Sequence, residues 1–156
     1  MTQAVPNGYH SVTPSLTFKD CNKAIDFYKK AFGAKVIDFL TNPGGKGVMH
    51  ATIQIGNSIL MMGDEMPQCQ SAETLGGVSP ISLYVYVPNA DETFKRALEA
   101  GATQVMPVAE MFWGDRAGTF KDPFGYSWMV ATHTRDLTND QITKGAEDFF
   151  AQIGKK

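Results

Sequence analysis

The feature that most constrains the fold is a short segment that occurs twice in the chain. Residues 56–61 read GNSILM, and residues 125–130 read GYSWMV. Each copy begins at a glycine and continues into an apolar run, a pattern typical of a β-hairpin. The second copy follows the turn Asp122-Pro123-Phe124-Gly125, where proline fixes φ and glycine supplies a positive φ. A repeated segment of this kind predicts two structural units built to one plan.

The first unit is expected to contain a strand, a helix and three further strands. Alternating polar and apolar residues at 11–18 predict a strand, and Pro14 favours an edge position because it donates no ladder hydrogen bond. Apolar residues then recur with helical spacing up to Gly33, after a cap at Asp20 or Asn22. The remaining strands of the unit are expected at residues 36–41, 48–55 and 58–62.

The second unit repeats this order, and a C-terminal helix follows it. The expected elements are a strand at 81–87, a helix between Asn89 and Gly101, a strand at 103–107 and the hairpin of residues 111–130. A capping box at Thr138 and Gln141 begins the last helix, whose Phe149 and Phe150 need a partner surface on the body or on a second subunit. The chain is interpreted as one domain, residues 1–156, with module one at 9–64, a connector at 65–79, module two at 80–133 and the C-terminal helix at 138–153.

The composition excludes several classes of function. A length of 156 residues suffices for one domain, and 43% hydrophobic and 19% charged residues are typical of a globular protein. A net charge of −2 gives no general attraction to nucleic acid or to an anionic membrane, and no apolar run is long enough to span a bilayer. The N-terminus lacks a secretory pattern and Cys21 and Cys69 lack metal-type spacing, so we expect a cytoplasmic protein.

Several short motifs occur along nearly the whole chain in an order that matches a known superfamily. They are VTP at 12–14, AIDFYKKAFGA at 24–34, MHA at 49–51, IGNS at 55–58, LGG at 75–77, GDR at 114–116, GT at 118–119, DPFG at 122–125 and ATH at 131–133. The chain resembles the vicinal oxygen chelate superfamily, and most closely its PhnB-like glyoxalase/bleomycin resistance branch. The resemblance implies an α+β fold in which paired βαβββ modules enclose a cavity, often in a homodimer.

The resemblance also locates the positions that bind a divalent metal ion in metal-using members. Carried onto this chain, these positions are Thr13, Met61, Ser82 and Met129. Hydroxyl and thioether groups are poor ligands for Zn, Ni, Fe or Mn. Tyr84 and Tyr126 stand where many PhnB-like relatives have histidine. No metal site and no cofactor are therefore expected, except for a divalent ion at a non-standard site, and metal-dependent glyoxalase or dioxygenase chemistry is disfavoured.

Strand alternation indicates which side chains line the expected cavity. Thr13 lies on the polar face of its strand, and Ser82 shares a face with Tyr84. Small hydroxyls, thioethers and phenols would suit a neutral, partly apolar small molecule. The predicted lining consists of Thr13, Ser15, His50, Met61, Ser82, Tyr84, Trp113, Arg116, Tyr126 and Met129.

The histidines are the first candidates for chemistry. His50 lies in a predicted strand and, with a pKa near neutrality, is either a base or ligand in the cavity or a structural hydrogen-bonding group. His133 follows the last predicted strand and is interpreted as a structural cap. His10 lies in the N-terminal segment and is interpreted as exposed.

Arg116 is the second candidate catalytic residue. Its guanidinium could hold an anionic substrate group, or it could form a structural ion pair with Asp115 or Asp122. Trp113 lies beside Gly114 and is either a lid over the cavity or packed against the C-terminal helix.

Three functional hypotheses follow. The favoured one is a metal-free protein of the bleomycin-resistance type, which binds a small molecule as a homodimer. The second is a glyoxalase-like or dioxygenase-like enzyme with a displaced site around His50, assisted by Tyr84, Tyr126 or Arg116. The third is a non-catalytic interaction protein whose cavity is filled by side chains. The sequence leaves open whether the chain is an enzyme, and it predicts a small-molecule ligand and a second copy of the chain as partners, with no nucleic acid and no membrane.

Overall fold

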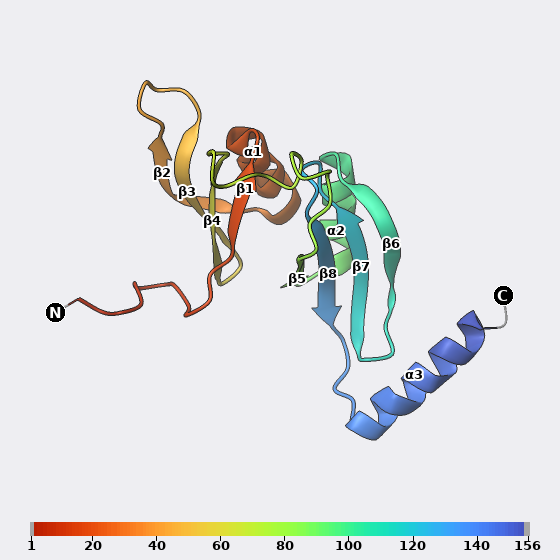
Figure 1. Ribbon diagram of the computed structural model, residues 1–156. Coiled ribbons are helices and arrows are strands. Elements are labelled where there is room, and N and C mark those ends of the chain that lie inside the picture. Colours follow the sequence, from red (N-terminus) through yellow and green to blue (C-terminus); the bar gives the residue numbers. More distant parts are fainter. Residues whose placement is uncertain (1, 155–156) are drawn as a thin grey trace.

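A computed structural model describes residues 2–154 and contains two modules of the predicted plan (Figure 1). The sheet of the first module has the order β1-β4-β3-β2, with β1 parallel to β4 and the other neighbours antiparallel. Its elements are β1 (Ser15–Phe18), α1 (Cys21–Phe32), β2 (Lys35–Thr41), β3 (Val48–Ile55) and β4 (Ser58–Asp64).

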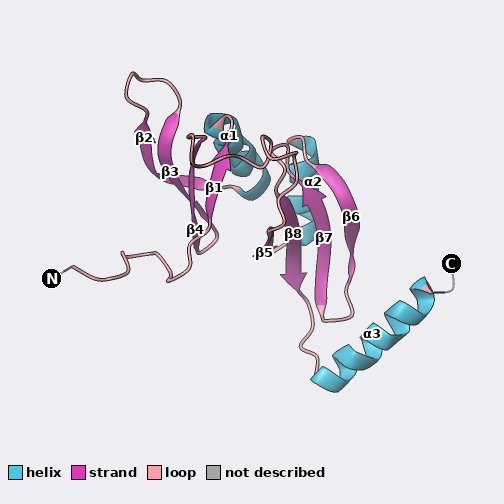
Figure 2. Ribbon diagram, viewed as in Figure 1, coloured by secondary structure: helices cyan, strands magenta, loops and turns pink. Residues whose placement is uncertain are grey.

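The second module repeats this topology with the sheet order β5-β8-β7-β6, and β5 runs parallel to β8 (Figure 2). Its elements are β5 (Ser82–Tyr86), α2 (Ala90–Glu99), β6 (Thr103–Glu110), β7 (Asp115–Lys121) and β8 (Ser127–His133), and α3 (Asn139–Ile153) follows. The predicted α+β fold of paired βαβββ modules with a C-terminal helix is confirmed.

Local chemistry fixes the ends of the module helices. The Asp20 side chain caps α1 by accepting a hydrogen bond from the Lys23 amide, and Asn89 caps α2 in the same way. Gly33 ends α1 at φ 66°, a left-handed conformation that glycine adopts without a Cβ clash.

One hydrophobic core joins the two modules. Helices α1 and α2 contact each other, and buried side chains of both sheets belong to the same cluster. Aromatic rings fill its centre, among them Phe18 and Tyr28 of the first module and Phe120 and Trp128 of the second. The helix-bearing faces of both sheets meet in this core, so the opposite faces point outward. We call these outward faces the open faces.

Strand alternation assigns side chains to the two faces of each sheet. Leu16 and Phe18 of β1 are buried, whereas Ser15, the first residue of the strand, is exposed. In β5, Leu83 and Val85 pack against the core while Tyr84 and Tyr86 lie on the open face. The predicted polar faces of these strands are therefore the open faces.

The first strand is shorter than predicted. It begins at Ser15 rather than at residue 11, and the preceding residues form a bend in which the Thr13 hydroxyl donates to the His10 carbonyl at 3.1 Å. Alternation continues through residues 11–14, but Pro14 has no amide hydrogen to extend the ladder, although its carbonyl accepts from the Met61 amide. In the second module, β6 extends to Glu110, beyond the predicted end at residue 107.

Helix α3 stands apart from the body at the end of β6 and β7 (Figure 1). The predicted capping box is present, since the side chains of Thr138 and Gln141 each bond the other residue's backbone amide. The rings of Phe112 and Phe149 lie 5.6 Å apart, which is the aromatic contact of α3 with the body. Among the described residues, no helix has the length and apolar character needed to cross a membrane.

Candidate functional site

The open face of the second module carries a cluster of polar side chains centred on Asp115. One carboxylate oxygen of Asp115 accepts hydrogen bonds from the hydroxyls of Tyr84 at 2.6 Å and Tyr86 at 3.0 Å. The same oxygen accepts from Trp113 Nε1 at 3.0 Å, and the other oxygen lies 2.8 Å from His133 Nδ1. We call these five residues the Asp115 cluster. Asp115 is 1% exposed, so these bonds replace the water that its carboxylate would otherwise bind.

Three strands and one turn build the Asp115 cluster. Asp115 is paired with His133 across β7 and β8, while β5, next to β8, supplies the two tyrosines. Trp113 lies in the turn between β6 and β7, which Gly114 closes at φ 101°. The Gly114 carbonyl accepts hydrogen bonds from the amides of residues 134 and 135, which ties this turn to the end of β8.

The electrostatics of the cluster favour hydrogen bonding over proton transfer. Burial acts to raise the pKa of Asp115, but the hydrogen bonds from Tyr84, His133 and its other partners outweigh burial and bring the pKa below its ordinary value. Burial, followed by the bond to Asp115, raises the pKa of the Tyr84 phenol. The same two causes raise the pKa of Tyr86. Both phenols therefore remain protonated donors near neutral pH.

His133 links the cluster to solvent. Its Nε2 lies 2.9 Å from Asp136, and its side chain is 51% exposed. The bonds to Asp136 and Asp115 raise the pKa of His133 above its ordinary value. The imidazole therefore carries a positive charge over a wider pH range than a free histidine does.

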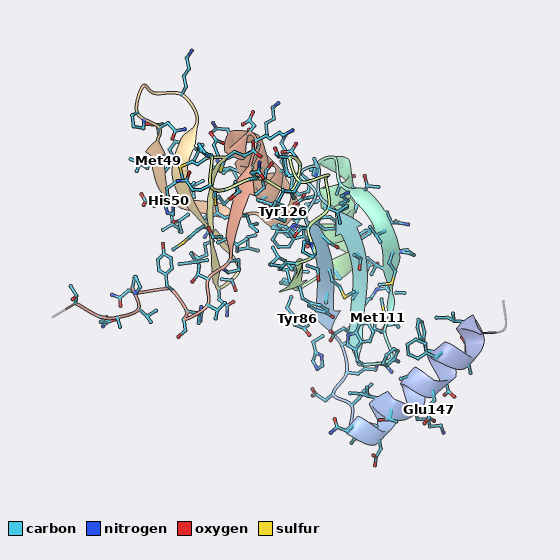
Figure 3. All side chains as sticks on the ribbon, in the orientation of Figure 1. Met49, His50, Tyr86, Met111, Tyr126 and Glu147 are labelled. Atoms are coloured by element: carbon cyan, nitrogen blue, oxygen red, sulfur yellow. The ribbon has the colours of Figure 1, made fainter. Side chains whose placement is uncertain are left out.

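A small apolar cluster lies beside these polar groups on the second module. Met111, Ala117 and Ala131 are buried, and Trp113 and Met129 pack against them. Figure 3 shows Met111 and Tyr86, both on this module. The surface there combines thioethers and phenols, two of the three kinds of group that the sequence predicts for the cavity lining.

The open face of the first module holds a second polar group. His50 Nε2 lies 3.1 Å from the Thr52 hydroxyl, which also lies 3.3 Å from the Tyr9 hydroxyl. The N-terminal segment passes over this face and forms a cavity of about 520 Å³, whose lining includes Tyr9, Thr13 and Met61. Figure 3 shows His50 on the first module, far from Tyr86 on the second.

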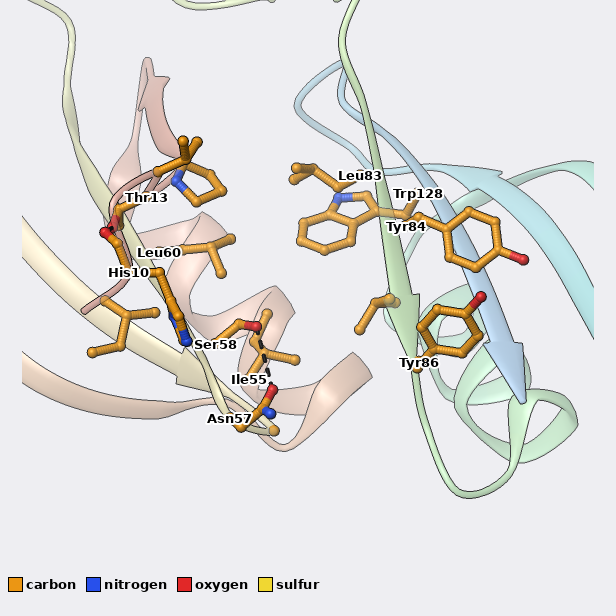
Figure 4. A pocket seen from close by; sticks show the side chains of 15 residues that line it. His10, Thr13, Ile55, Asn57, Ser58, Leu60, Leu83, Tyr84, Tyr86 and Trp128 are labelled. Carbon is orange, nitrogen blue, oxygen red and sulfur yellow. Dashed lines mark hydrogen bonds between the residues drawn. The ribbon is translucent and has the colours of Figure 1, made fainter. Parts of the chain in front are cut away.

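A third hollow lies between the two modules (Figure 4). Its volume is about 480 Å³. Thr13 and Leu60 of the first module lie across it from Leu83 and Trp128 of the second. Its polar lining includes His10, Asn57 and Ser58. We call this hollow the inter-module pocket.

Comparison with known proteins identifies the family. Residues 9–130 match the model of the Glyoxalase/Bleomycin resistance protein/Dioxygenase superfamily. The chain belongs to this superfamily. An uncharacterized protein of Mycobacterium bovis is 36% identical over 137 residues, which cover 85% of this chain and 89% of that protein.

Solved structures of other proteins share the fold. The crystal structure of TioX from Micromonospora sp. ML1 is 25% identical, with a TM-score of 0.61 and coverage of 83% of this chain and 100% of TioX. A PhnB protein from Bacillus cereus, described as a putative 3-demethylubiquinone-9 3-methyltransferase, is 21% identical, with a TM-score of 0.60 and coverage of 79% and 99%. The resemblance to the PhnB-like branch is thus confirmed at the level of the fold.

The residues at the superfamily's metal positions do not fit a divalent metal ion. Of the four positions, Met61 lies opposite Ser15 and Met129 opposite Tyr84 in the strand register, whereas Thr13 precedes β1 and Ser82 lies opposite Ser127. These neighbours offer thioethers and neutral hydroxyls, which divalent zinc, nickel, iron and manganese bind weakly. Within residues 2–154, no group of three or more His, Cys, Asp or Glu side chains is arranged to hold a metal ion.

The structure distributes the predicted cavity residues over several places. Thr13 lines both the first-module cavity and the inter-module pocket, which also contains Tyr84. Trp113 and Met129 lie together on the second module, whereas His50 lies on the first. Ser15 and Ser82 are exposed on the edge strands of the two sheets.

The prediction that Tyr126 lines the cavity is wrong. Tyr126 is 9% exposed and packs against Phe18 in the shared core. Its hydroxyl donates to the Thr17 carbonyl at 2.8 Å, so it connects the second hairpin to β1. It follows the turn glycine and faces the helices, on the opposite side of the sheet from the Asp115 cluster.

The prediction that Arg116 lines the cavity is also wrong, and its partners differ from those expected. Arg116 follows Asp115 in β7 and therefore points to the helix-bearing face. Its guanidinium makes two hydrogen bonds to Asp91, at 2.6 and 2.7 Å, and lies 3.5 Å from Glu110. The alternative of a structural ion pair is confirmed, with Asp91 and Glu110 in place of Asp115 or Asp122.

The central member of the site, Asp115, is not among the site residues predicted from the sequence. The sequence predicts Asp115 only as a partner for Arg116, and His133 only as a structural cap. Alternation in β7 could have placed Asp115 on the open face, since Ala117 and Thr119 share its parity. Trp113, interpreted as a lid or as packing, instead donates its indole N–H to Asp115.

Proposed function

We propose that this superfamily member binds a small, partly apolar molecule without a resident divalent metal ion. The observation that carries the proposal is the inter-module pocket. Its volume of about 480 Å³ lies within the range of roughly 300–1,000 Å³ typical of small-molecule sites. Apolar walls with a few polar groups are also typical of such sites, and here the lining combines Leu60, Leu83 and Trp128 with Asn57 and Ser58.

The chemistry of the side chains favours binding over catalysis. Because the pKa values of Tyr84 and Tyr86 are raised, both phenols stay protonated near neutral pH and are not available to accept a proton. Asp115 is occupied by four hydrogen-bond donors, and the donor set at the superfamily's metal positions suits no divalent ion. The superfamily's description includes bleomycin resistance proteins, which is compatible with a binding role.

The experiment is a titration with Nile red, a neutral apolar dye, into protein treated with EDTA. We expect saturable fluorescence enhancement that EDTA does not change. Ser58→Trp would fill the pocket, because Ser58 lies on its wall, and should weaken Nile red binding at least about tenfold. Gln104→Trp is the matched control, since Gln104 is exposed on β6 outside the pocket.

Two results would overturn the proposal. The first is a Kd for Nile red that is the same in Ser58→Trp as in Gln104→Trp, which would place the dye elsewhere. The second is loss of binding after EDTA treatment with recovery on addition of zinc or nickel, which would require a metal ion in the site.

A further inference from the structure

The free edge of strand β1 is closed by a side chain of the second hairpin. Within the described chain, β1 pairs with β4 alone, which leaves its other edge without a strand partner. The Tyr126 hydroxyl donates to the Thr17 carbonyl at 2.8 Å and accepts from the Thr17 amide at 3.3 Å. The Tyr126 ring packs against Phe18, with 5.5 Å between the ring centroids. One phenol therefore satisfies both backbone groups that Thr17 presents at this edge.

Ser58 occupies the position in the first hairpin that Tyr126 occupies in the second. Ile55 and Ser58 are the paired residues next to the first turn. At the second turn, the Asp122 amide donates to the Tyr126 carbonyl at 2.8 Å and closes the hairpin. The second turn is one residue longer, which shifts this correspondence by one position from the repeat in the sequence. The two modules thus differ at this point, because one hairpin carries a phenol and the other a short hydroxyl.

Tyr86 in β5 corresponds to Thr17 in β1. The strand register pairs Thr17 with Gly63 and Tyr86 with Ala131. Gly63 and Ala131 lie equally far along the chain from the residues that close the two hairpins. The repeat therefore relates the edge of β1 that a phenol closes to the edge of β5 at Tyr86.

The backbone of β5 at Tyr86 has no partner on this edge. The Val87 amide donates to the Ala131 carbonyl at 2.8 Å, and alternate residues of a strand direct their backbone groups to the same side. Tyr86 therefore directs its amide and its carbonyl away from β8. Within residues 2–154, β5 pairs only with β8, and no loop amide or carbonyl bonds the Tyr86 backbone.

The inter-module pocket lies along this free edge. Residues 83–86 of β5 all line the pocket. Successive side chains of a strand point to opposite faces, so a hollow that touches four residues in a row lies at the edge of the strand. Figure 4 shows the hydroxyls of Tyr84 and Tyr86 on the far side of β5 from Ser58, which belongs to the first-module wall of the pocket. The pocket thus lies where the repeat would place a second side chain like that of Tyr126.

We propose that the inter-module pocket binds a phenolic ligand, whose hydroxyl bonds the backbone of Tyr86 as the Tyr126 hydroxyl bonds that of Thr17. This inference rests on the proposed function and names the chemical class of the ligand. A phenol is suited to the position because one oxygen both donates and accepts, which matches the amide and the carbonyl of a single residue. The ligand would then repeat, in the second module, a contact that the chain itself makes in the first.

The lining of the pocket favours a neutral aromatic ligand. Leu60, Leu83 and Trp128 supply apolar surface, and no described Lys, Arg, Asp or Glu lines the pocket. A carboxylate or ammonium group would lose water there without gaining an opposite charge, whereas a neutral phenol carries no such cost. Met61 and Met129, at two of the superfamily's metal positions, lie outside the lining. The hydroxyl is therefore recognised by backbone groups of the β5 edge.

The first experiment compares three small aromatic molecules by ligand-observed NMR titration. The compound p-cresol is the tyrosine side chain itself, toluene lacks the hydroxyl, and 4-methylanisole keeps the oxygen but cannot donate a hydrogen bond. The Kd of p-cresol should be at least about fivefold lower than the Kd of either other compound, because p-cresol alone makes both hydrogen bonds to Tyr86.

The second experiment lets the chain supply the phenol. Ser58→Tyr places a phenol at the counterpart of Tyr126 and should abolish p-cresol binding. This variant should also melt about 2 °C or more above Ser58→Phe, which fills the same space without a hydroxyl. Gln104→Tyr and Gln104→Phe are the matched controls, because Gln104 is exposed on β6 and these two variants should melt alike.

The outcomes separate this inference from the proposed function. If Nile red binds as expected but toluene binds as tightly as p-cresol, the phenolic ligand is excluded and the proposed function stands. If neither Nile red nor p-cresol binds, both proposals fail. Binding of p-cresol that Ser58→Tyr leaves intact overturns the inference, and so does a Ser58→Tyr variant that melts no higher than Ser58→Phe. Where circular dichroism shows that a variant is unfolded, the three ligand titrations on the unmodified chain decide the question.

Discussion

The hydroxyl of Tyr28 lies 2.6 Å from a carboxylate oxygen of Asp122, although the two residues belong to different modules. Trp128 Nε1 donates to the same oxygen at 3.0 Å, and the amides of Phe124 and Tyr126 donate to the other at 2.9 Å. The aspartate of the Asp-Pro-Phe-Gly turn therefore both shapes its own turn and bonds helix α1. This contact connects the repeated hairpin to the core that the modules share.

Tyr28→Phe should lower the free energy of unfolding by about 1–3 kcal/mol. The change removes one donor from a buried carboxylate, and a buried polar group that loses a partner costs about that amount. Tyr9→Phe is the matched control, because the Tyr9 hydroxyl makes a longer bond of 3.3 Å to Thr52 in a partly exposed setting. Urea denaturation measures both, and equal losses would contradict the role given to the contact between Tyr28 and Asp122.

Two adjacent methionines of β4 should respond differently to truncation. Met62 is 2% exposed in the core, whereas Met61 lies on the open face beside the first-module cavity. Met62→Ala should lower the free energy of unfolding by about 2–5 kcal/mol, as core truncations do, and Met61→Ala by less than about 1 kcal/mol. A large loss for Met61→Ala in denaturant titrations would instead support the hypothesis of a cavity filled by side chains.

The order of elements could be predicted because each signal is local. The repeated hairpin, the caps at Asp20 and Asn89 and the left-handed Gly33 all depend on residues close in sequence. The start of β1 could not be predicted in the same way. A strand requires a hydrogen-bonding partner, and alternation before Pro14 does not reveal that the ladder with β4 begins at Ser15.

The candidate site was harder to predict because its members come from separate strands. Tyr84 and His133 are 31 and 18 residues from Asp115, and no spacing in the sequence indicates that they converge. Tyr126 is the reverse case, because the sequence predicts it to line the cavity and the structure does not place it there. The resemblance marks it as a position where relatives have histidine, but the structure buries it in the core at the second hairpin.

The stability contributed by His133 should depend on pH. Its pKa is raised in the folded protein by Asp136 and Asp115, so its contribution is full below the unfolded pKa of about 6.5 and is lost as pH rises through the higher folded pKa. The stability difference between the unmodified chain and His133→Gln should therefore be larger at pH 5.5 than at pH 9. Urea titrations at both pH values measure it, and a difference that grows with pH would contradict this account.

Gly114 should tolerate alanine less well than Gly76, although both have nearly the same backbone conformation. Their φ angles are 101° and 100°, so each substitution carries the left-handed strain of about 1–2 kcal/mol. At Gly76 an added Cβ meets no described atom within 4 Å, whereas at Gly114 it would overlap the carbonyl oxygen of Arg135. Gly76→Ala thus measures strain alone, and the additional loss in Gly114→Ala measures the close approach of the two chain segments.

The same comparison reports on the Asp115 cluster. If Gly114→Ala displaces the turn, the indole of Trp113 moves relative to Asp115 and its fluorescence emission should shift, while Gly76→Ala should leave the emission unchanged. Equal losses of stability in the two variants, with no change in the Trp113 emission, would show that the turn can move without disturbing the cluster. The tight approach of Gly114 to the segment after β8 would then have no part in holding the Asp115 cluster together.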